Sequence, residues 1–214
     1  DLDAVIQPGL EGLMLSKVSG PDSMKSMDTL VSELEHRKSM SVGHTQFAPI
    51  LETAISIELA FPIACEPRVA TLCAASARNG DVARSVGFQW TPQGLESLYL
   101  KSRAIMATRA AGKDYPLGGL WQDVHDLDGL RKSCEFHRQL GFTGEIILHP
   151  SNVPIVNEVF TPGAAEIAYY QGMVDAFAEA EKAGNAAVMY EGEHVDYAHV
   201  TTARQILDLV KAFD

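Results

Sequence analysis

Short apolar runs alternate with stretches of helical length through the first 150 residues, and this alternation constrains the fold most. Apolar runs bounded by turn residues predict buried strands, whereas apolar residues at helical spacing predict amphipathic helices. Repeated units of this kind join parallel strands through right-handed crossovers. The sequence therefore predicts an α/β fold built on a parallel sheet.

Five strand–helix units are expected. The expected strands span residues 12–18, 47–51, 69–75, 117–124 and 145–149, and the expected helices span residues 22–40, 54–64, 92–111 and 127–140. A closed barrel and a doubly wound sheet both fit this order, but no GxGxxG motif follows a strand, which disfavours the nucleotide-binding sheet. The expected fold is a (β/α)₈ TIM barrel. Since such a barrel has eight strands, we expect about three N-terminal units to lie outside this sequence.

The pattern changes after Pro150. Residues 166–184 predict one long Ala-rich helix, the segment AAVMY leads into EGEHVD, and a last helix is expected from about His199 to Phe213. This tail does not continue the barrel units. We therefore expect the C-terminal part of a barrel at residues 1–158 and a helical C-terminal extension or lid at residues 159–214.

Composition and charge narrow the class of protein. The chain is 46% hydrophobic and 21% charged, as is common for a globular protein. Its formal charge of −11 argues against nucleic acid as a partner. No apolar run approaches the roughly 20 residues of a membrane span. The three cysteines fit neither a CxxC metal pair nor a disulfide framework, so we expect reduced, mostly buried thiols and a cytoplasmic protein.

Two carboxylates follow consecutive predicted strands. Glu52 comes directly after the apolar residues APIL, and Asp81 follows VATLCAA after a short polar loop. Glu52 could instead begin the following helix, where the helix dipole favours an acidic residue, and Asp81 could be an N-cap of the next turn. Because catalytic groups of a parallel barrel lie at the carboxyl ends of its strands, the two side chains could converge. Two carboxylates and several waters are a common protein site for Mg²⁺.

Lys17 and His149 also end predicted strands and are the candidate cofactor-contacting residues. A single lysine after a strand is more often a solvated charge. His149 precedes Pro150, which favours a fixed, buried turn over a catalytic role. The remaining histidines form no HxxxH or HExxH motif, so zinc is not expected, and no GxSxG motif supports a serine hydrolase.

Several segments together resemble the citrate lyase β-subunit and HpcH/HpaI aldolase family. GLMLSKV resembles the strand G-hydrophobic-LPKV, PILETA resembles LLETA, and NGDVARSVG resembles the loop GxDxxxxxG. The most specific stretch is LGFTGEIILHPSNVPIVNEVFTP, which resembles LGFxGKxxIHPxQIxxVNxxFxP. EGEHVDYAHVTTARQIL resembles the closing DGxMIDxPxxxxAxxIL. These segments lie in the family's order along essentially the whole chain.

The resemblance implies a function. Glu52 and Asp81 would be the Mg²⁺ ligands, and Asp196 the acid/base that handles the α-proton of an acyl-CoA, often in a neighbouring subunit. The expected enzyme is a carbon–carbon lyase that cleaves or forms a 3-hydroxy-dicarboxylic acyl-CoA such as malyl-CoA or citryl-CoA. A homo-oligomer, a trimer or a multiple of one, is also implied. Asp196 could equally be an N-cap of the last helix.

Two alternatives remain open at this stage. One is a metal-dependent aldolase that acts on free 4-hydroxy-2-keto acids and needs no coenzyme A. The other is a non-catalytic barrel subunit or binding module. The chain also departs from the family's pattern at four positions. These are Ser16 for proline, Ser19 for an acidic residue, Gly80 for a frequent glutamate and Glu145 for a usual lysine.

Overall fold

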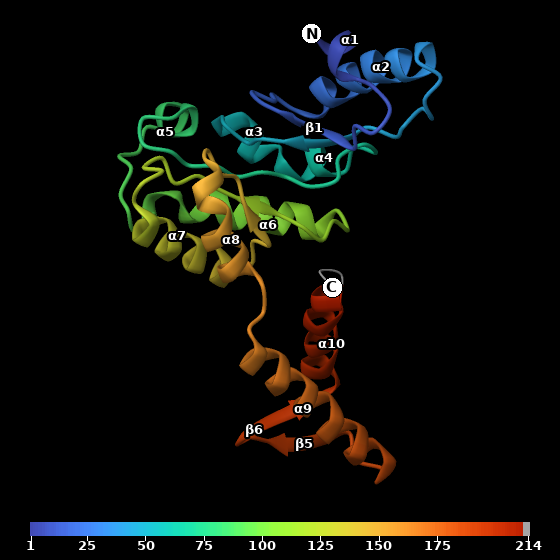
Figure 1. Ribbon diagram of the computed structural model, residues 1–214, viewed down its shortest axis with the longest axis vertical. Coiled ribbons are helices and arrows are strands. Elements are labelled where there is room, and N and C mark those ends of the chain that lie inside the picture. The colour runs from blue at the N-terminus through green and yellow to red at the C-terminus, as the bar shows by residue number, and fades with distance from the viewer. Residues whose placement is uncertain (212–214) are drawn as a thin grey trace. The chain divides into compact units, whose positions relative to one another are not determined.

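The computed structural model describes residues 1–211 and contains two compact units, residues 1–160 and the residues from Thr161 onward (Figure 1). The first unit carries the helices and strands labelled α1 to α8 and β1 to β4. The second carries α9, β5, β6 and α10. Each unit has its own hydrophobic core, so each is described separately.

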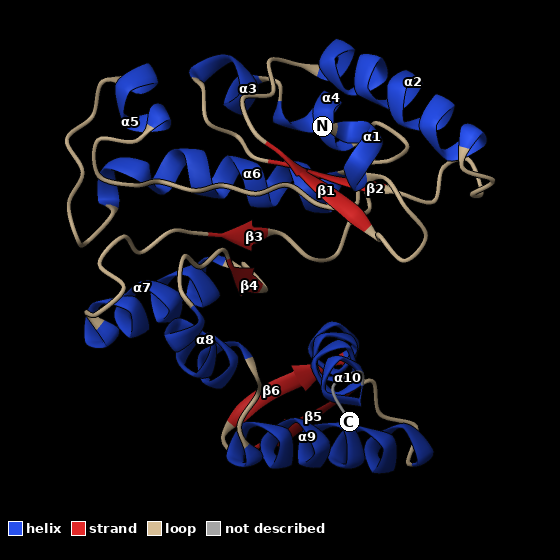
Figure 2. Cartoon of the chain, turned by 45° about the horizontal axis from the view of Figure 1, so that its top comes forward, coloured by secondary structure: helices blue, strands red, loops and turns tan. Residues whose placement is uncertain are grey.

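The strands of the first unit are parallel and pair in the order of the sequence (Figure 2). β1 pairs with β2, and Phe47 and Ile50 pair with Val69 and Cys73, which form isolated bridges. Cys73 also bridges to Leu117 of β3, and β3 pairs with β4. The strands span Gly12–Leu15 (β1), Gln46–Pro49 (β2), Leu117–Gly118 (β3) and Gly144–Glu145 (β4). The predicted α/β class with parallel strands is confirmed.

Helical segments connect the strands, as the alternation predicts. They span Leu2–Val5 (α1), Pro21–Arg37 (α2), Ala54–Glu58 (α3), Ala60–Ala64 (α4), Asp81–Val86 (α5), Leu95–Ser97 (η1), Leu98–Ala110 (α6), Leu127–Leu140 (α7), Pro150–Asn152 (η2) and Val153–Phe160 (α8). Helix α7 has the predicted bounds. It begins after Asp126, whose side chain accepts a hydrogen bond from the Gly129 N–H, and it ends at Gly141 in the left-handed conformation.

The expected helix at 54–64 is instead two short helices, and Pro62 explains the break. Proline has no N–H, so Pro62 cannot donate to the carbonyl oxygen of Glu58 four residues earlier. That oxygen accepts a hydrogen bond of 2.6 Å from the guanidinium of Arg103, which also donates to the Ile57 carbonyl at 2.8 Å. A side chain of α6 therefore binds the backbone carbonyls at the break.

The strands are shorter than predicted. The strand expected at 117–124 is paired as a strand only at Leu117 and Gly118, and the strand expected at 145–149 only at its first residue. Gly118 and Gly119 end the regular pairing. Gly119 has φ +149°, a backbone conformation that residues with a side chain rarely adopt. Backbone hydrogen bonds nevertheless continue, because Ser76 N–H donates to Gly119 and Ile146 N–H donates to Gly118.

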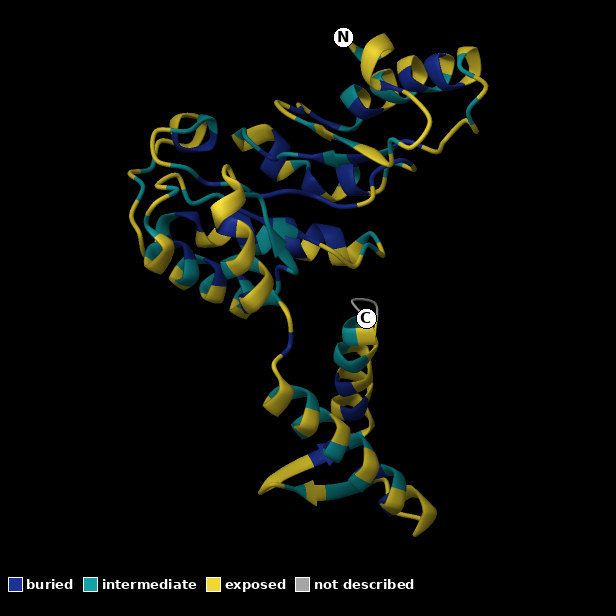
Figure 3. Cartoon of the chain, in the orientation of Figure 1, coloured by how far each residue is buried: buried dark blue, intermediate teal, exposed yellow. Residues whose placement is uncertain are grey.

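The core of the first unit lies where the strands meet the helices (Figure 3). Phe47, Leu51, Val69 and Leu72 are at most 1% exposed. Cys73 and Cys134 are buried and unpaired, which confirms the prediction of mostly buried thiols, whereas Cys65 is exposed.

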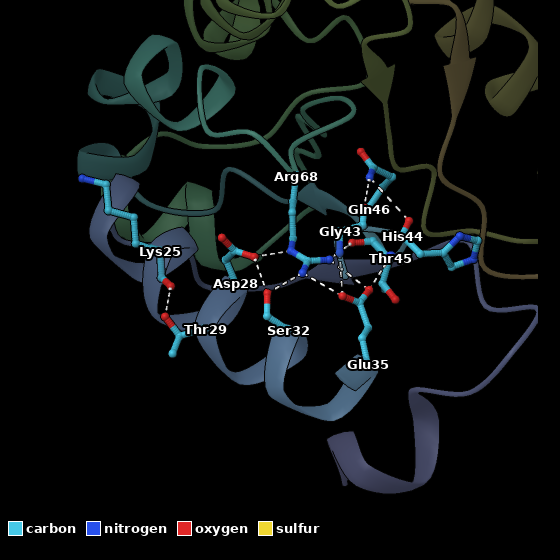
Figure 4. Close-up of polar contacts among 10 residues, drawn as sticks. All are labelled: Lys25, Asp28, Thr29, Ser32, Glu35, Gly43, His44, Thr45, Gln46 and Arg68. Atoms are coloured by element: carbon cyan, nitrogen blue, oxygen red, sulfur yellow. Dashed lines mark hydrogen bonds and ion pairs between the residues drawn. The ribbon is translucent and has the colours of Figure 1, made fainter. Parts of the chain in front are cut away.

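A buried ion pair lies at the amino ends of β2 and of the segment that begins at Val69 (Figure 4). Two guanidinium nitrogens of Arg68 donate to the two carboxylate oxygens of Glu35 at 3.0 and 2.8 Å. Backbone N–H groups of Gly43 and Thr45 donate to the same carboxylate at 2.8 and 2.7 Å. Asp28 also pairs with Arg68. Because all of these groups bind one another, this end of the sheet has a structural role.

The second unit differs from the purely helical extension that we predicted. Between helices α9 (Ala164–Lys182) and α10 (Tyr197–Lys211) lies an antiparallel hairpin of β5 (Ala187–Tyr190) and β6 (Glu193–Asp196). Its turn, Glu191 and Gly192, has positive φ at both residues, the geometry that favours a two-residue hairpin. The expected end of the last helix at Phe213 lies outside the described residues.

Candidate metal and acid/base site

Three of the predicted site residues follow neighbouring strands of the first unit. Lys17 comes two residues after β1, and Glu52 follows Leu51, whose N–H donates to the Cys73 carbonyl at 2.8 Å. Asp81 is the first residue of α5, after the segment that contains Cys73. All three therefore lie beyond the carboxyl ends of their strands, where parallel α/β proteins bind ligands.

The carboxylate of Glu52 is held by the backbone of Lys17. The Lys17 N–H donates to Oε2 of Glu52 at 3.0 Å, although 35 residues separate the two in sequence. Lys17 has φ +55°, a left-handed conformation that residues other than glycine seldom adopt. This conformation is part of the turn that presents its N–H to the carboxylate. In the described part of the chain, Oε1 of Glu52 forms no hydrogen bond or ion pair.

Asp81 begins a short helix that contacts the segment after Glu52. Its carboxylate pairs with Arg84 on the same helix, and both side chains are partly exposed. The hydroxyl of Ser85 accepts a hydrogen bond of 2.9 Å from the N–H of Ala54, two residues after Glu52. Helices α3 and α5 also contact each other. The structure thus joins the segments that carry the two acidic residues.

The donor set fits a hard cation that keeps part of its water shell. Within residues 1–211, no group of three or more His, Cys, Asp or Glu side chains is gathered for a metal. Zn²⁺ in structural sites usually takes four protein ligands, whereas Mg²⁺ is commonly held by one or two carboxylates, waters and substrate oxygens. The Oε1 oxygen of Glu52 and the partly exposed carboxylate of Asp81 are of the kind that Mg²⁺ prefers as ligands.

His149 lies in a turn, but it is exposed, so the expectation of a buried turn is wrong in that respect. Its Nδ1 accepts a hydrogen bond from the Ser151 N–H at 3.2 Å and lies 2.8 Å from the Ser151 hydroxyl. The histidine therefore caps the short helix η2, and its role in binding a cofactor stays a prediction.

Asp196 lies at the end of β6 in the second unit and caps α10. Its Oδ1 accepts hydrogen bonds from the Ala198 N–H at 3.0 Å and the His199 N–H at 3.4 Å, and it lies 2.6 Å from Nδ1 of His199. The hydrogen bond from the His199 ring lowers the pKa of Asp196, and the backbone N–H groups add to that effect. Asp196 is thus a helix cap with a histidine partner. Our sequence interpretation missed that partner, although the spacing Asp-x-x-His was visible.

Glu145, which stands where the resembled family usually has lysine, has a fully buried side chain. Its Oε2 lies 2.7 Å from Nδ1 of His137 on α7. Gly118 must be glycine beside this pair, because a Cβ there would lie 2.9 Å from the Glu145 carboxylate and 3.0 Å from the His137 ring. The glutamate at position 145, which replaces the lysine usual in the family, is therefore paired with His137 within the first unit.

Residues 1–150 match the HpcH/HpaI aldolase/citrate lyase family. Two curated relatives match almost the whole chain. A (3S)-malyl-CoA thioesterase of Cereibacter sphaeroides is 29% identical over 212 residues, which cover 99% of this chain and 69% of the relative. A citrate lyase subunit β of Leuconostoc mesenteroides is 27% identical, with the same coverage. The family match and the citrate lyase relative confirm the prediction of a carbon–carbon lyase family, whereas the name of the C. sphaeroides relative refers to thioester hydrolysis.

Solved structures show the same fold. A citrate lyase from Burkholderia xenovorans superposes with a TM-score of 0.84 at 18% identity, over 99% of this chain and 67% of that chain. The CitE protein of Mycobacterium tuberculosis, crystallised with magnesium, acetoacetate and coenzyme A, gives a TM-score of 0.69 at 20% identity, over 94% of this chain and 68% of that chain. Among the described helices of the present chain, none is both long and apolar enough to cross a membrane.

Proposed function

Because the chain belongs to the HpcH/HpaI aldolase/citrate lyase family, we propose that it is a Mg²⁺-dependent lyase for a 3-hydroxy-dicarboxylic acyl-CoA. The substrate would be of the malyl-CoA or citryl-CoA type, and the products an acyl-CoA and a keto acid. Support comes from two strand-end carboxylates, Glu52 and Asp81, on segments joined by the Ala54–Ser85 hydrogen bond. That arrangement is the observation on which the proposal depends.

Glu52 and Asp81 would hold the metal. Bound Mg²⁺ would supply Lewis-acid stabilisation of negative charge on substrate oxygens. The hydrogen bond from the Lys17 N–H would fix the direction of the Glu52 carboxylate, which leaves Oε1 for the ion. To bind the ion, the Asp81 carboxylate would have to leave its ion pair with Arg84. Asp81 is partly exposed, which allows that change. The magnesium with which the CitE protein was crystallised supports this assignment.

Asp196 would handle the α-proton of the acyl-CoA. Its carboxylate would be ionised at neutral pH and could accept the proton. The hydrogen bond from His199, which lowers the pKa of Asp196, would stabilise the ionised form and make it a weaker base. Lys17 and His149, both exposed, would contact the substrate or its coenzyme A part. The coenzyme A bound in the CitE structure and the acyl-CoA in the name of the C. sphaeroides relative support an acyl-CoA substrate.

Three further proposals concern the closed barrel, the cellular compartment and the assembly of the protein. The parallel order of the strands supports a closed (β/α)₈ barrel to which this chain contributes five strand positions. The unpaired cysteines fit a cytoplasmic protein. Assembly into a homotrimer or a multiple of one stays a prediction, which light scattering at micromolar concentration tests.

A second candidate function is hydrolysis of the thioester. It is favoured by the name of the C. sphaeroides relative, a (3S)-malyl-CoA thioesterase. Carbon–carbon cleavage releases a keto acid, whereas hydrolysis releases a free thiol. The two reactions therefore have different products, and one assay can separate them.

The test is an assay of the full-length protein with malyl-CoA and Mg²⁺. Phenylhydrazine detects keto-acid release and a thiol reagent detects free coenzyme A, with parallel runs in chelator and with free 4-hydroxy-2-keto acids. We expect keto-acid release that chelator abolishes. Thiol release alone would assign the chain to the thioesterases, and turnover of only the free keto acids would assign it to the aldolases. No turnover of any substrate would contradict an enzymatic role.

A further inference from the structure

Lys101 of α6 carries a buried amine that the proposed lyase reaction does not use. The residue is only 4% exposed. Its ammonium lies 5.8 Å from the centre of the Phe136 ring, but in the described part of the chain it forms no hydrogen bond or ion pair. Burial lowers the pKa of Lys101 to about 8, although the carboxylates of Glu145 and Glu96 oppose the shift. An amine that is buried without a partner and easily loses its charge is a candidate nucleophile.

Lys101 lines a small cavity of about 30 Å³. Trp121 and Phe136 line both this cavity and an open groove of about 930 Å³, so a molecule in the groove has access to the cavity. One water molecule needs roughly 10–15 Å³ of such space. The cavity therefore has room for about two waters, or for a group of two or three heavy atoms.

A histidine–carboxylate pair lies beside the amine. His137 lines the same cavity, and its Nδ1 lies 2.7 Å from Oε2 of the buried Glu145 side chain. When Nδ1 carries the proton of this bond, Nε2 of the neutral ring is an acceptor, and Nε2 is buried without a hydrogen bond. A nucleophile, a base and a carboxylate that orients the base are the usual parts of a centre for covalent chemistry.

The charges around the cavity do not favour an anion. Oε1 of Glu145 is a further buried acceptor without a hydrogen bond, and an uncharged Lys101 would leave that carboxylate without a nearby compensating charge. The Nε1–H of Trp121 is a buried donor without a partner, which suits a carbonyl oxygen. The groove is lined by two cations and three carboxylates: Arg78, Lys132, Asp123, Asp126 and Asp128. An uncharged carbonyl group therefore fits this place better than a carboxylate does.

We propose that Lys101 is acylated by a thioester that carries a small, uncharged acyl group. The Lys101 amine would attack the thioester carbonyl carbon, and the Trp121 N–H would donate to its oxygen. The carbon–sulfur bond would break, which leaves an amide at Nζ and releases a thiolate. The proton lost by the amine would pass to Nε2 of His137 and from there to the thiolate. The inference rests on the proposed function for its acyl donor, because cleavage of malyl-CoA or citryl-CoA leaves acetyl-CoA.

Acylation can be measured without the lyase reaction. The full-length protein is incubated at pH 8 without Mg²⁺ with S-acetyl-N-acetylcysteamine, a neutral thioester, and separately with its S-succinyl analogue, whose acyl group carries a carboxylate. Peptide mass spectrometry gives the rate at each lysine. Exposed lysines are almost wholly protonated at pH 8, so Lys101 should be acetylated at least about tenfold faster than the exposed Lys182. Succinylation of Lys101 should be slower than its acetylation.

Two further measurements test the amine and its base. The rate at Lys101 should level off above about pH 8, whereas the rate at Lys182 should go on rising. His137→Gln removes the proton acceptor, so it should slow acetylation of Lys101 by at least about tenfold and leave Lys182 unchanged. Circular dichroism checks that the variant is folded, and the pH profile of the wild type needs no variant.

Three results would overturn the inference. These are acetylation of Lys101 no faster than that of Lys182, succinylation as fast as acetylation, and an unchanged rate at Lys101 in folded His137→Gln. None of them would affect the metal proposal, because neither Mg²⁺ nor a lyase substrate is present in these experiments.

Discussion

The N–H of Lys17 donates to Oε2 of Glu52 at 3.0 Å, and this bond links the turn after β1 to the carboxylate after β2. The interaction uses only the backbone of Lys17, whose φ of +55° is more favourable for glycine. The backbone and the side chain of this residue can therefore be tested separately: the backbone positions the carboxylate that we propose as a metal ligand, and the side chain is exposed.

Lys17→Gly tests this separation. The variant keeps the N–H and relieves the left-handed strain, so stability should be unchanged or raised by up to about 1 kcal/mol. Mg²⁺ affinity should also be unchanged, whereas KM for the acyl-CoA should rise if the ammonium contacts substrate. Lys17→Met is the matched control, because it removes the same charge but keeps the strain. Weaker Mg²⁺ binding in Lys17→Gly, measured by calorimetry, would refute the backbone role.

The Glu35–Arg68 pair should control stability in acid. Burial alone would raise the pKa of Glu35, but hydrogen bonds from Arg68 and from backbone N–H groups lower it to about 2. Since the folded pKa lies below the ordinary 4.5, the stabilisation is present above about pH 4.5 and is lost as the pH falls towards 2.

Glu35→Gln should lower the free energy of unfolding by roughly 3 kcal/mol at neutral pH, because it leaves Arg68 buried without its main partner. The difference from the wild type should shrink below about pH 4, which urea unfolding at several pH values measures. Glu33→Gln, an exposed change on the same helix, serves as the control. An equal difference at all pH values would show that ionised Glu35 does not stabilise the fold.

Gly118 should tolerate no side chain. A Cβ there would meet the buried carboxylate of Glu145 and the ring of His137 at 2.9 and 3.0 Å, so Gly118→Ala should cost about 2 kcal/mol. Gly144→Ala on the adjacent strand meets only the end of the Leu117 side chain, at 3.1 Å, and should cost less than about 1 kcal/mol. Equal melting temperatures for the two variants would contradict this packing.

Substitutions can separate the helix cap at Asp196 from the acid/base role that we propose for it. Asp196→Asn keeps a capping oxygen for α10 but removes the base, so it should retain stability and lose most activity. Asp196→Ala removes both, and should also lower stability by about 1 kcal/mol. Thermal unfolding and keto-acid release are measured on both variants. If Asp196→Asn remains active, Asp196 is only a helix cap.

Local signals in the sequence predicted some elements closely and others poorly. Helix α7 was predicted to the residue, because Asp126 and Gly141 mark its ends by chemistry that acts within one turn. The strand expected at 117–124 was too long, because an apolar run does not show where its pairing stops. The hairpin of β5 and β6 was missed, because Glu191-Gly192 is not one of the usual turn pairs such as Asn-Gly, and its positive φ angles appear only in the structure.

The candidate site was predictable in part. The order of strands and helices predicted that Glu52 and Asp81 follow consecutive strand positions, but it could not predict the Lys17 and Ser85 contacts, which depend on tertiary packing. Glu145 was noted only as a departure from the family's pattern, and its partner His137 gave no usable signal. Charged and polar residues are mostly exposed, so their shared burial becomes visible only in the folded chain.

Titration of the full-length protein with Mg²⁺ by calorimetry tests the central claim most directly. Glu52→Gln and Asp81→Asn should each weaken binding by at least about tenfold, because each removes a full negative charge from beside a divalent ion. Circular dichroism should show both variants folded, and Glu33→Gln should bind Mg²⁺ like the wild type. Unchanged Mg²⁺ affinity in both site variants would contradict the assignment of Glu52 and Asp81 as the metal ligands.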